Sequence, residues 1–184
     1  MRMLKPILLV LSGMLVGSIL YAFAPELIRT ADDEPPANLV VVSKRLHTAG
    51  QPTAAQLAGL GDRGYDLVLN LAPPEVFGSL QNEGGIVGQT GLRYINIPVD
   101  WHRPKVEDFR FFSSVLQQPA HRQILVHCQI NKRASLFTFL YRVVHERADP
   151  DEAYENVTAI WVPDPHWVEF ANRILTQHGI EFEL

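Results

Sequence analysis

The sequence predicts an α/β domain whose central sheet of about four to five strands is mostly parallel and is flanked by helices. Short apolar runs that read as buried strands alternate with longer segments of helical periodicity, which is the pattern of strands joined by helical crossovers. The chain has 184 residues, of which 47% are hydrophobic and 20% are charged. This balance is typical of one globular domain.

The chain begins with a segment that predicts a membrane helix. Arg2 and Lys5 precede residues 6–24, which contain no charged side chain. As a helix these residues would extend roughly 28 Å, close to the ~30 Å hydrocarbon core of a bilayer. We interpret residues 1–24 as an uncleaved signal anchor that binds the membrane through residues 6–24. A signal peptide cleaved after Ala24 is the alternative.

Both interpretations place the folded domain outside the cytoplasm. The flank of a membrane segment that is richer in Lys and Arg stays on the cytoplasmic side, and here that flank precedes the segment. The domain is therefore expected in the periplasm, anchored to the membrane, or exported if the segment is removed. A polar, proline-ended linker at 25–36 separates the segment from the domain at 37–184.

The domain opens with two short extended runs and a helix. Residues 39–42 are rich in valine, and residues 46–49 lead into a turn that contains Gly and Pro. A helix is expected over 53–62, because Thr53 followed three residues later by Gln56 is a capping-box pattern.

Four elements follow in the middle of the chain. Residues 66–71 are too short and too continuously apolar for an amphipathic helix, so they predict a buried strand. The segment 76–91 has a weak helical pattern that is interrupted by glycines. Another strand is expected over 94–99, and residues 106–117 carry apolar side chains at helical spacing.

The last third of the chain predicts one strand and three helices. Residues 123–128 form an apolar strand that ends in His-Cys. The helix over 134–146 has the most regular apolar periodicity in the chain, and two further helices are expected at 151–161 and 165–178. Strands and helices thus alternate, as a mostly parallel sheet requires.

Charge and cysteine content exclude several function classes. The chain has 16 Lys and Arg against 20 Asp and Glu, a formal net charge of −4, whereas nucleic-acid binding needs a basic face. The single cysteine, Cys128, excludes an intramolecular disulfide and any zinc site built on two thiolates. The histidines lie at scattered spacings, so neither a metal site nor a cofactor is expected.

Cys128 occupies a position suited to a nucleophile. It lies at the carboxyl end of a strand, where ligands bind in open α/β sheets, and a short polar loop leads from it to the helix that opens at Ala134. Loop N–H groups and a helix N-terminus together favour an anion, and they favour a thiolate over a thiol. Arg133 closes the loop with a guanidinium that can bind two phosphate oxygens.

The residues around Cys128 resemble a known phosphatase signature. Residues 127–133 read His-Cys-Gln-Ile-Asn-Lys-Arg. This stretch resembles the signature loop of cysteine-dependent protein tyrosine and dual-specificity phosphatases, and more closely that of a bacterial phosphatase-like family found elsewhere fused to β-lactamase-hydrolase-like domains. Residues 48–52, 64–71 and 97–101 occur in an order similar to that family's, so the resemblance spans about 40–145.

The resemblance implies a protein-tyrosine-phosphatase-like fold and a two-step hydrolysis of phosphate monoesters through a cysteinyl-phosphate. By this resemblance Cys128 is the nucleophile and Arg133 binds the phosphate. His127 would orient the loop and tune the thiolate, although a purely structural histidine is an equal alternative. The implied phosphate-binding residues are Gln129, Ile130, Asn131, Lys132, Arg133, Ala134 and Ser135.

The resemblance also implies a general acid on the loop before the third helix of the domain. Asp100 follows the strand that ends near Pro98, as the family's acid does. Glu107 and Asp108 are close enough in sequence to compete for this role, and Asp100 could instead cap a turn.

The loop departs from the tyrosine phosphatase pattern in three ways. Four residues separate Cys128 from Arg133, whereas tyrosine phosphatases have five. The shorter spacing resembles that of the bacterial phosphatase-like family and also that of rhodanese sulfurtransferases. Asn131 is the residue best able to adopt the left-handed conformation that a glycine usually supplies in such loops. Ala134 directly follows the arginine, so a hydroxyl that assists the departing thiolate would have to come from Ser135, which could instead cap the helix.

These observations leave three functional hypotheses. The first is a phosphatase that acts on a phosphorylated protein, lipid or small molecule. The second is a sulfurtransferase that uses a persulfide on Cys128, and the third is a non-catalytic domain that binds an anion in the same loop.

Overall fold

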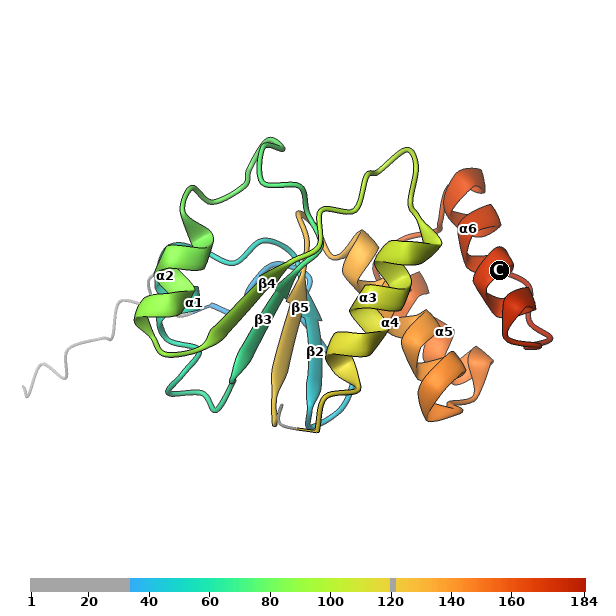
Figure 1. Cartoon of the computed structure of the whole chain (residues 1–184), viewed down its shortest axis with the longest axis horizontal. Helices are drawn as coiled ribbons and strands as arrows, with labels where there is room; N and C mark the ends of the chain where they lie inside the picture. Colours follow the sequence, from blue (N-terminus) through green and yellow to red (C-terminus); the bar gives the residue numbers. More distant parts are fainter. Residues whose placement is uncertain (1–33, 120–121) are drawn as a thin grey trace, which may run out of the picture.

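The computed structural model describes residues 34–119 and 122–184, and the expected domain forms a single α/β sandwich (Figure 1). Its strands are β1 (Val40–Val41), β2 (Leu46–Ala49), β3 (Leu67–Asn70), β4 (Arg93–Asn96) and β5 (Ile124–His127). Its helices are α1 (Ala54–Ala58), α2 (Glu83–Gln89), α3 (Val106–Leu116), α4 (Lys132–Tyr141), the π-helix η1 (Arg142–Glu146), α5 (Pro150–Thr158) and α6 (Pro165–Gln177).

The five strands form one sheet in the order β1-β2-β5-β3-β4, in which only the short edge strand β1 is antiparallel. The sheet therefore confirms the predicted strand number and the mostly parallel arrangement. His127 of β5 pairs with Ala49 of β2 and with Asn70 of β3. The register thus places the carboxyl-terminal residues of three neighbouring strands side by side.

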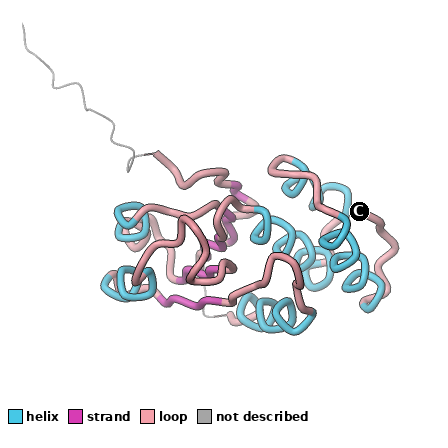
Figure 2. The backbone as a smooth tube through the Cα atoms, turned by 90° about the horizontal axis from the view of Figure 1, so that it is seen from above, coloured by secondary structure: helices cyan, strands magenta, loops and turns pink. Residues whose placement is uncertain are grey.

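Helices cover both faces of the sheet (Figure 2). On one face Val68 and Leu125 belong to a small buried cluster that includes Leu57 of α1 and Val87 of α2. Side chains alternate between the two faces along a strand. His127, two residues after Leu125, therefore lies on the α1 and α2 side.

The other face carries the larger part of the core, under α3, α4, α5 and α6 (Figure 1). Val126 and Cys128 belong to this larger cluster, together with Phe112 of α3 and Phe137 of α4. Two adjacent residues of the predicted signature, His127 and Cys128, are thus buried on opposite faces of the sheet.

Several boundaries differ from the sequence-based prediction. The capping box at Thr53 is present, but α1 ends at Ala58 rather than near residue 62. Only Glu83–Gln89 of the segment 76–91 is helical, because the residues before it form a loop. The helix expected from Ala134 begins two residues earlier, at Lys132, and ends as a π-helix.

The described chain begins in the last part of the predicted linker, and these residues contact the domain. Pro36 is buried, and the Gln56 side chain donates a hydrogen bond to the Glu34 carbonyl (2.8 Å). The predicted anchor at 1–24 lies outside the described residues. Within residues 34–119 and 122–184, no helix combines the length and the apolar content needed to cross a bilayer.

Candidate active site

The loop between β5 and α4 turns through a left-handed residue. Asn131 has φ 71° and ψ 0°, and α4 starts at the next residue, Lys132. This conformation strains most residues with a β-carbon but is tolerated by asparagine. The structure therefore confirms that Asn131 takes the conformation that a glycine usually supplies.

The Asn131 side chain fastens this loop to the rest of the domain. Its Nδ2 donates hydrogen bonds to the Asn38 carbonyl (2.7 Å) and to the Thr48 hydroxyl (3.0 Å), and the residue is fully buried. The amide of Asn38 in turn donates to the carbonyl of Ile130 (3.1 Å). Asn131 therefore holds the loop from outside rather than lining the pocket.

A second support comes from the turn after β2. The N–H of Gln51 donates to the Gln129 carbonyl (2.9 Å), and Gly50 forms an isolated antiparallel bridge with Ile130. A β-carbon on Gly50 would lie 3.0 Å from the carbonyl oxygens of both Ala37 and Gln129. Only glycine allows the two loops to approach this closely.

Cys128 lies at the base of a small pocket of about 150 Å³. The pocket is lined by Trp101, Cys128, Gln129, Ile130, Lys132 and Arg133. Five of these six residues come from the predicted signature or its loop. Asp100, His127, Asn131, Ala134 and Ser135 do not line it.

Arg133 is buried beside the cysteine. The residue is 3% exposed, and its guanidinium carbon lies 5.4 Å from the centre of the Trp101 ring. Burial lowers the pKa of Arg133, and the charge of Cys128, a hydrogen bond to Cys128 and the charge of Asp100 oppose that shift. The guanidinium and the thiol are therefore direct neighbours in a partly dehydrated site, where electrostatic interactions are strong.

The start of α4 supplies further donors at this position. The N–H groups of Lys132, Arg133 and Ala134 donate to no backbone carbonyl of the described chain, as is usual in the first turn of a helix. The Lys132 ammonium lies 5.6 Å from the centre of the Trp101 ring and 5.1 Å from that of Trp161. Free N–H groups and two cations next to one thiol make a site for an anion.

Asp100 lies on the loop after β4, close to the rim of this pocket. Its Oδ1 accepts hydrogen bonds from the N–H groups of His102 (2.8 Å) and Arg103 (3.3 Å). The hydrogen bond from His102 is the main cause that lowers the pKa of Asp100. Asp100 is thus an ionised turn residue in this arrangement, and its charge acts on Arg133.

The other predicted acids and the hydroxyl occupy different surroundings. Glu107 is exposed and pairs with Arg110 (3.7 Å), whereas burial raises the pKa of Asp108. Neither carboxylate lines the pocket. The hydroxyl of Ser135 donates to the Lys132 carbonyl (3.0 Å), so it is bonded to the backbone of its own helix.

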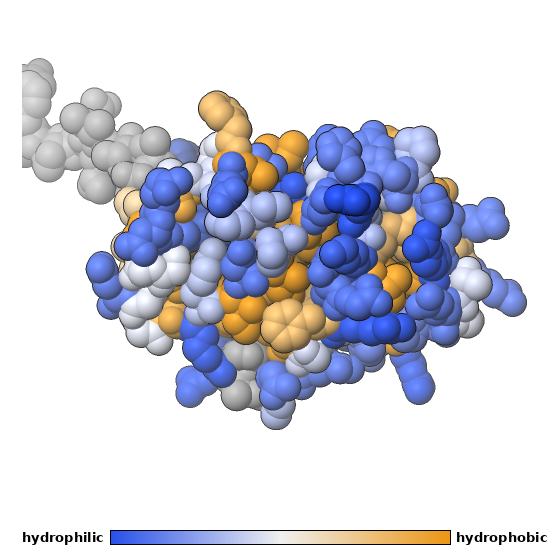
Figure 3. Space-filling view, turned by 45° about the horizontal axis from the view of Figure 1, so that its top comes forward, coloured by the Kyte–Doolittle hydropathy of each residue, from blue (hydrophilic) through white to orange (hydrophobic). Residues whose placement is uncertain are grey.

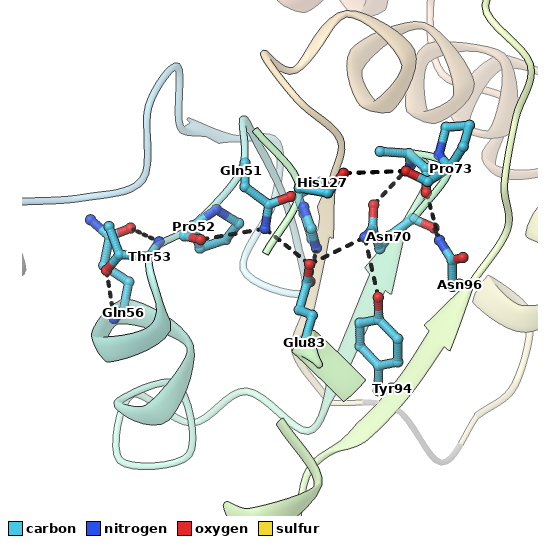
Figure 4. A network of polar contacts seen from close by, with 12 residues as sticks. Gln51, Pro52, Thr53, Gln56, Asn70, Pro73, Glu83, Tyr94, Asn96 and His127 are labelled. Carbon is cyan, nitrogen blue, oxygen red and sulfur yellow. Dashed lines mark hydrogen bonds and ion pairs between the residues drawn. The ribbon is translucent and has the colours of Figure 1, made fainter. Parts of the chain in front are cut away.

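His127 makes a contact that the sequence did not predict (Figure 4). Its Nε2 lies 2.6 Å from Oε1 of Glu83, the first residue of α2, and both side chains are at least 95% buried. The other carboxylate oxygen of Glu83 accepts hydrogen bonds from Gln51 Nε2 (3.0 Å) and Asn70 Nδ2 (3.3 Å). Asn70 also donates to the hydroxyl of Tyr94 (3.2 Å).

Nothing in the sequence singles out Glu83. The residue lies in the glycine-rich segment 76–91, whose helical pattern is weak, and no motif around it indicates a partner for His127. Within the described ranges, no three His, Cys, Asp or Glu side chains are grouped to hold a metal ion.

Comparison with known proteins gives structural but no sequence matches. No family model matches the chain, and no curated protein matches it by sequence. The crystal structure of a candidate phosphatase (DUF442) from Shewanella putrefaciens CN-32 is 30% identical, with a TM-score of 0.72, over 80% of this chain and 97% of that one.

More distant structures share the fold. Tk-PTP in its active form is 16% identical, with a TM-score of 0.64, over 76% of this chain and 97% of that one. The core catalytic domain of the PP-IP phosphatase SIW14 from S. cerevisiae is also 16% identical, with a TM-score of 0.64, over 82% of this chain and 99% of that one.

The order of the sheet, the loop around Cys128 and these similarities all indicate the same fold. At 30% identity over almost the whole of the Shewanella protein, the chain belongs to the DUF442 family of candidate phosphatases, which has the fold of protein tyrosine phosphatases.

Proposed function

We propose that this protein is a cysteine-dependent phosphate monoester hydrolase. The observation that carries the proposal is the burial of Arg133 directly beside Cys128, in a small pocket at the start of α4. A buried guanidinium needs an anionic partner, and a phosphate between the thiol and the guanidinium would supply it.

The reaction has two steps. The Cys128 thiolate attacks phosphorus, so that the S–P bond forms while the bond from phosphorus to the ester oxygen breaks. The departing oxygen takes a proton from a general acid. Water then attacks the cysteinyl-phosphate, inorganic phosphate leaves, and the thiolate is restored.

Arg133 and the loop N–H groups stabilise the phosphoryl oxygens in both steps. The guanidinium can bind two oxygens through its fork of N–H donors. The first-turn N–H groups of α4 can bind the remaining oxygen, because no backbone carbonyl of the described chain occupies them. Such fixed donors bind the transition state without reorganising.

Asp100 is the general acid of this proposal. The charge of Asp100 acts on Arg133, whereas Glu107 and Asp108 do not line the pocket. Its hydrogen bonds to the turn keep it ionised without substrate. Approach of a phosphate dianion would favour its protonated form, because like charges repel.

The surroundings of the pocket support a phosphorylated substrate with an apolar part next to the phosphate. Phe77 is 98% exposed and Ile130 is 50% exposed, and Gln129 Nε2 donates to the Phe77 carbonyl (2.8 Å). Apolar side chains also reach the surface between hydrophilic ones on the face drawn in Figure 3. The predicted anchor would place such a substrate outside the cytoplasm, at or near the membrane.

The test is hydrolysis of p-nitrophenyl phosphate by the full chain and by Cys128→Ser and Arg133→Lys. We expect no turnover by Cys128→Ser and a loss of about 10²–10³-fold in kcat/KM for Arg133→Lys, because the lysine cannot reproduce the paired donors. Arg110→Lys, an exposed change on α3, is the matched control with unchanged kcat/KM.

The same preparation separates the other two hypotheses. Formation of thiocyanate from thiosulfate and cyanide, without ester hydrolysis, would show a sulfurtransferase. A phosphate-dependent rise in Tm without turnover of any ester would show a binding domain, because a ligand that binds only the native state stabilises it. Either result would overturn the proposal.

A further inference from the structure

The pair Glu83–His127 lies directly behind the nucleophile. His127 precedes Cys128 in the chain, but its side chain is buried on the α2 side of the sheet, and the Cys128 side chain belongs to the opposite side. The two residues are therefore separated by one peptide unit and not by solvent. Glu83 does not line the pocket of Cys128.

Glu83 is a buried carboxylate that three side chains contact. The residue is 5% exposed and receives contacts from His127 (2.6 Å), Gln51 (3.0 Å) and Asn70 (3.3 Å). A buried carboxylate is costly unless it is paired and hydrogen-bonded. A glutamine at this position would carry no charge to compensate, so the charge itself calls for an explanation.

Strand register and helix packing fix the geometry of the pair. Asn70 and His127 are register partners on adjacent parallel strands, and α2 packs over them. Gln51 is held by its N–H bond to the loop carbonyl of Gln129. The carboxylate of Glu83 therefore links the turn after β2, the end of β3 and the end of β5 (Figure 4).

We propose that Glu83 is a positioning residue that acts through His127 on the ionisation of Cys128; the inference rests on the proposed role of Cys128 as nucleophile. The Glu83 carboxylate lies 2.6 Å from Nε2 of His127, so it holds the ring in place and provides a counter-charge for a proton on it. The ring is joined to Cys128 through one peptide unit and the carboxylate lies beyond its Nε2, so the ring is the nearer of the two groups to Cys128 along these contacts. A thiolate is favoured by such a cation.

The other charged and titratable groups around the pair have different roles. Arg133 and Lys132 of α4 lie on the pocket side, where Asp100 acts on Arg133. Asn70 donates hydrogen bonds to both Glu83 and Tyr94 of β4. Burial raises the pKa of Tyr94; the hydrogen bond from Asn70 opposes this rise, and the charge of Glu83 adds to it. Tyr94 is therefore a neutral hydroxyl at neutral pH.

Alkylation of Cys128 tests the proposal without any substrate. Cys128 is the single cysteine of the chain, so the rate of modification of the full chain by iodoacetamide, followed by mass spectrometry, reports on one thiolate. For Glu83→Gln we expect a rate about tenfold lower than the wild type at pH 6, because the imidazolium loses its counter-charge. At pH 9 the rates of the wild type and Glu83→Gln should converge, since high pH favours the Cys128 thiolate in both proteins.

Two further variants separate this role from a structural one. Glu75→Gln removes an exposed carboxylate from the same β3–α2 connection and should leave the rate unchanged. In the His127→Asn background, Glu83→Gln should change the rate by less than about twofold, because the two residues act as one unit. Tm is measured for every variant to verify the fold.

Three outcomes contradict the proposal. Equal rates for wild type and Glu83→Gln at pH 6 would show that the carboxylate does not affect the thiolate. A rate of alkylation that is lower by the same factor at all pH values would show that the substitution changes access of the reagent to Cys128. A faster rate of Glu83→Gln at pH 6 would show that the negative charge of Glu83 acts directly on the sulfur. The phosphatase assay is independent of these results, so failure of one does not imply failure of the other.

Discussion

Asn131 shows how one side chain can serve both the conformation of the loop and its attachment. Its positive φ starts the turn into α4, and its amide bonds tie that turn to Asn38 and Thr48. A backbone conformation that disfavours most side chains is thus stabilised by the side chain that occupies it. This residue type was predictable from the missing glycine, but its partners were not.

Replacing Asn131 should separate the two contributions. Asn131→Ala should lower the free energy of unfolding by about 3–4 kcal/mol, because it adds left-handed strain of ~1–2 kcal/mol and removes two hydrogen bonds of ~1 kcal/mol each. Asn131→Gly should cost about 2 kcal/mol, since glycine adopts this conformation without strain but also lacks the two hydrogen bonds. Urea denaturation of the two variants checks the order, and equal losses would contradict it.

Asp100 can be tested through the leaving group of the ester. Asp100→Asn should slow the hydrolysis of an alkyl phosphate by about 10²-fold, because an alkoxide needs a proton to depart. Hydrolysis of p-nitrophenyl phosphate should fall by less than about tenfold, since p-nitrophenolate leaves without one. Equal losses for the two esters would assign Asp100 to the turn alone.

The role of Asp100 as an acid also predicts how the rate of hydrolysis changes with pH. The hydrogen bond from His102 lowers the pKa of Asp100 from 3.8, so its protonated fraction decreases as the pH rises from acid to neutral. With an alkyl phosphate, kcat/KM, which reports the ionisation of the free enzyme, should therefore fall over this range in the wild type, and Asp100→Asn should abolish that fall. A fall that persists in Asp100→Asn would identify a different acid.

At the scale of residues, the sequence predicted the reactive side chains of the site better than the side chains that hold them in place. Cys128 and Arg133 belong to one short loop, so their proximity follows from the spacing along the chain. Glu83 meets His127 only because α2 packs over the ends of β3 and β5, which no local pattern encodes. Its segment also has several glycines, which weaken the helical signal.

At the scale of elements, the turn after β2 is the part that holds the signature loop from the side. Gly50 donates a hydrogen bond to the Ala37 carbonyl (2.7 Å) and forms a bridge with Ile130, so the turn is bonded directly to the loop. The resemblance marked residues 48–52 by their order in the chain. The structure gives that order a physical reason, because the turn and the loop form one bridge.

Gly50→Ala should therefore affect catalysis as well as stability. The new β-carbon would lie 3.0 Å from two carbonyl oxygens, and we expect a loss of about 1–3 kcal/mol in unfolding free energy, with a lower kcat/KM. Gly88→Ala is the matched control in α2, where a β-carbon meets no heavy atom within 4 Å, and it should be neutral or stabilising by about 0.5 kcal/mol. Unchanged kcat/KM for Gly50→Ala would contradict the bracing role.

Element types were predictable, whereas several ends were not. Apolar patterns identified the strands β3, β4 and β5 and the long helices, because each of these elements buries one or two faces in the core, whereas β1 and β2 were expected only as short extended runs. Helix α4 begins at Lys132, two residues before the predicted start at Ala134, because the left-handed residue Asn131 directly precedes it and ends the loop. The π-helix at Arg142–Glu146 has the same apolar spacing as an α-helix end, so sequence periodicity does not distinguish it.

At the scale of the whole molecule, the described domain begins beside its candidate site. Asn38 contacts Ile130 and Asn131, and only a short linker separates it from the predicted membrane segment. Residues 25–33 can reach at most about 30 Å when fully extended. The pocket of an anchored protein would therefore stay close to the membrane surface.

Fractionation of cells that express the full chain tests this arrangement. We expect the protein in the membrane fraction after an alkaline wash, with its domain digested by protease added to spheroplasts, because the basic flank precedes the segment. The mass of the purified protein shows whether the chain is cut after Ala24. Recovery in the cytoplasmic fraction would contradict both the anchor and the exported form.

The most direct test of the central claim is detection of the covalent intermediate. Full-length protein mixed with a phosphate monoester and quenched in acid should carry one phosphoryl group on the peptide that contains Cys128, as seen by mass spectrometry. Cys128→Ser should show neither this adduct nor turnover. Ester hydrolysis by Cys128→Ser at the wild-type rate would contradict the account, because the reaction would then not pass through this sulfur.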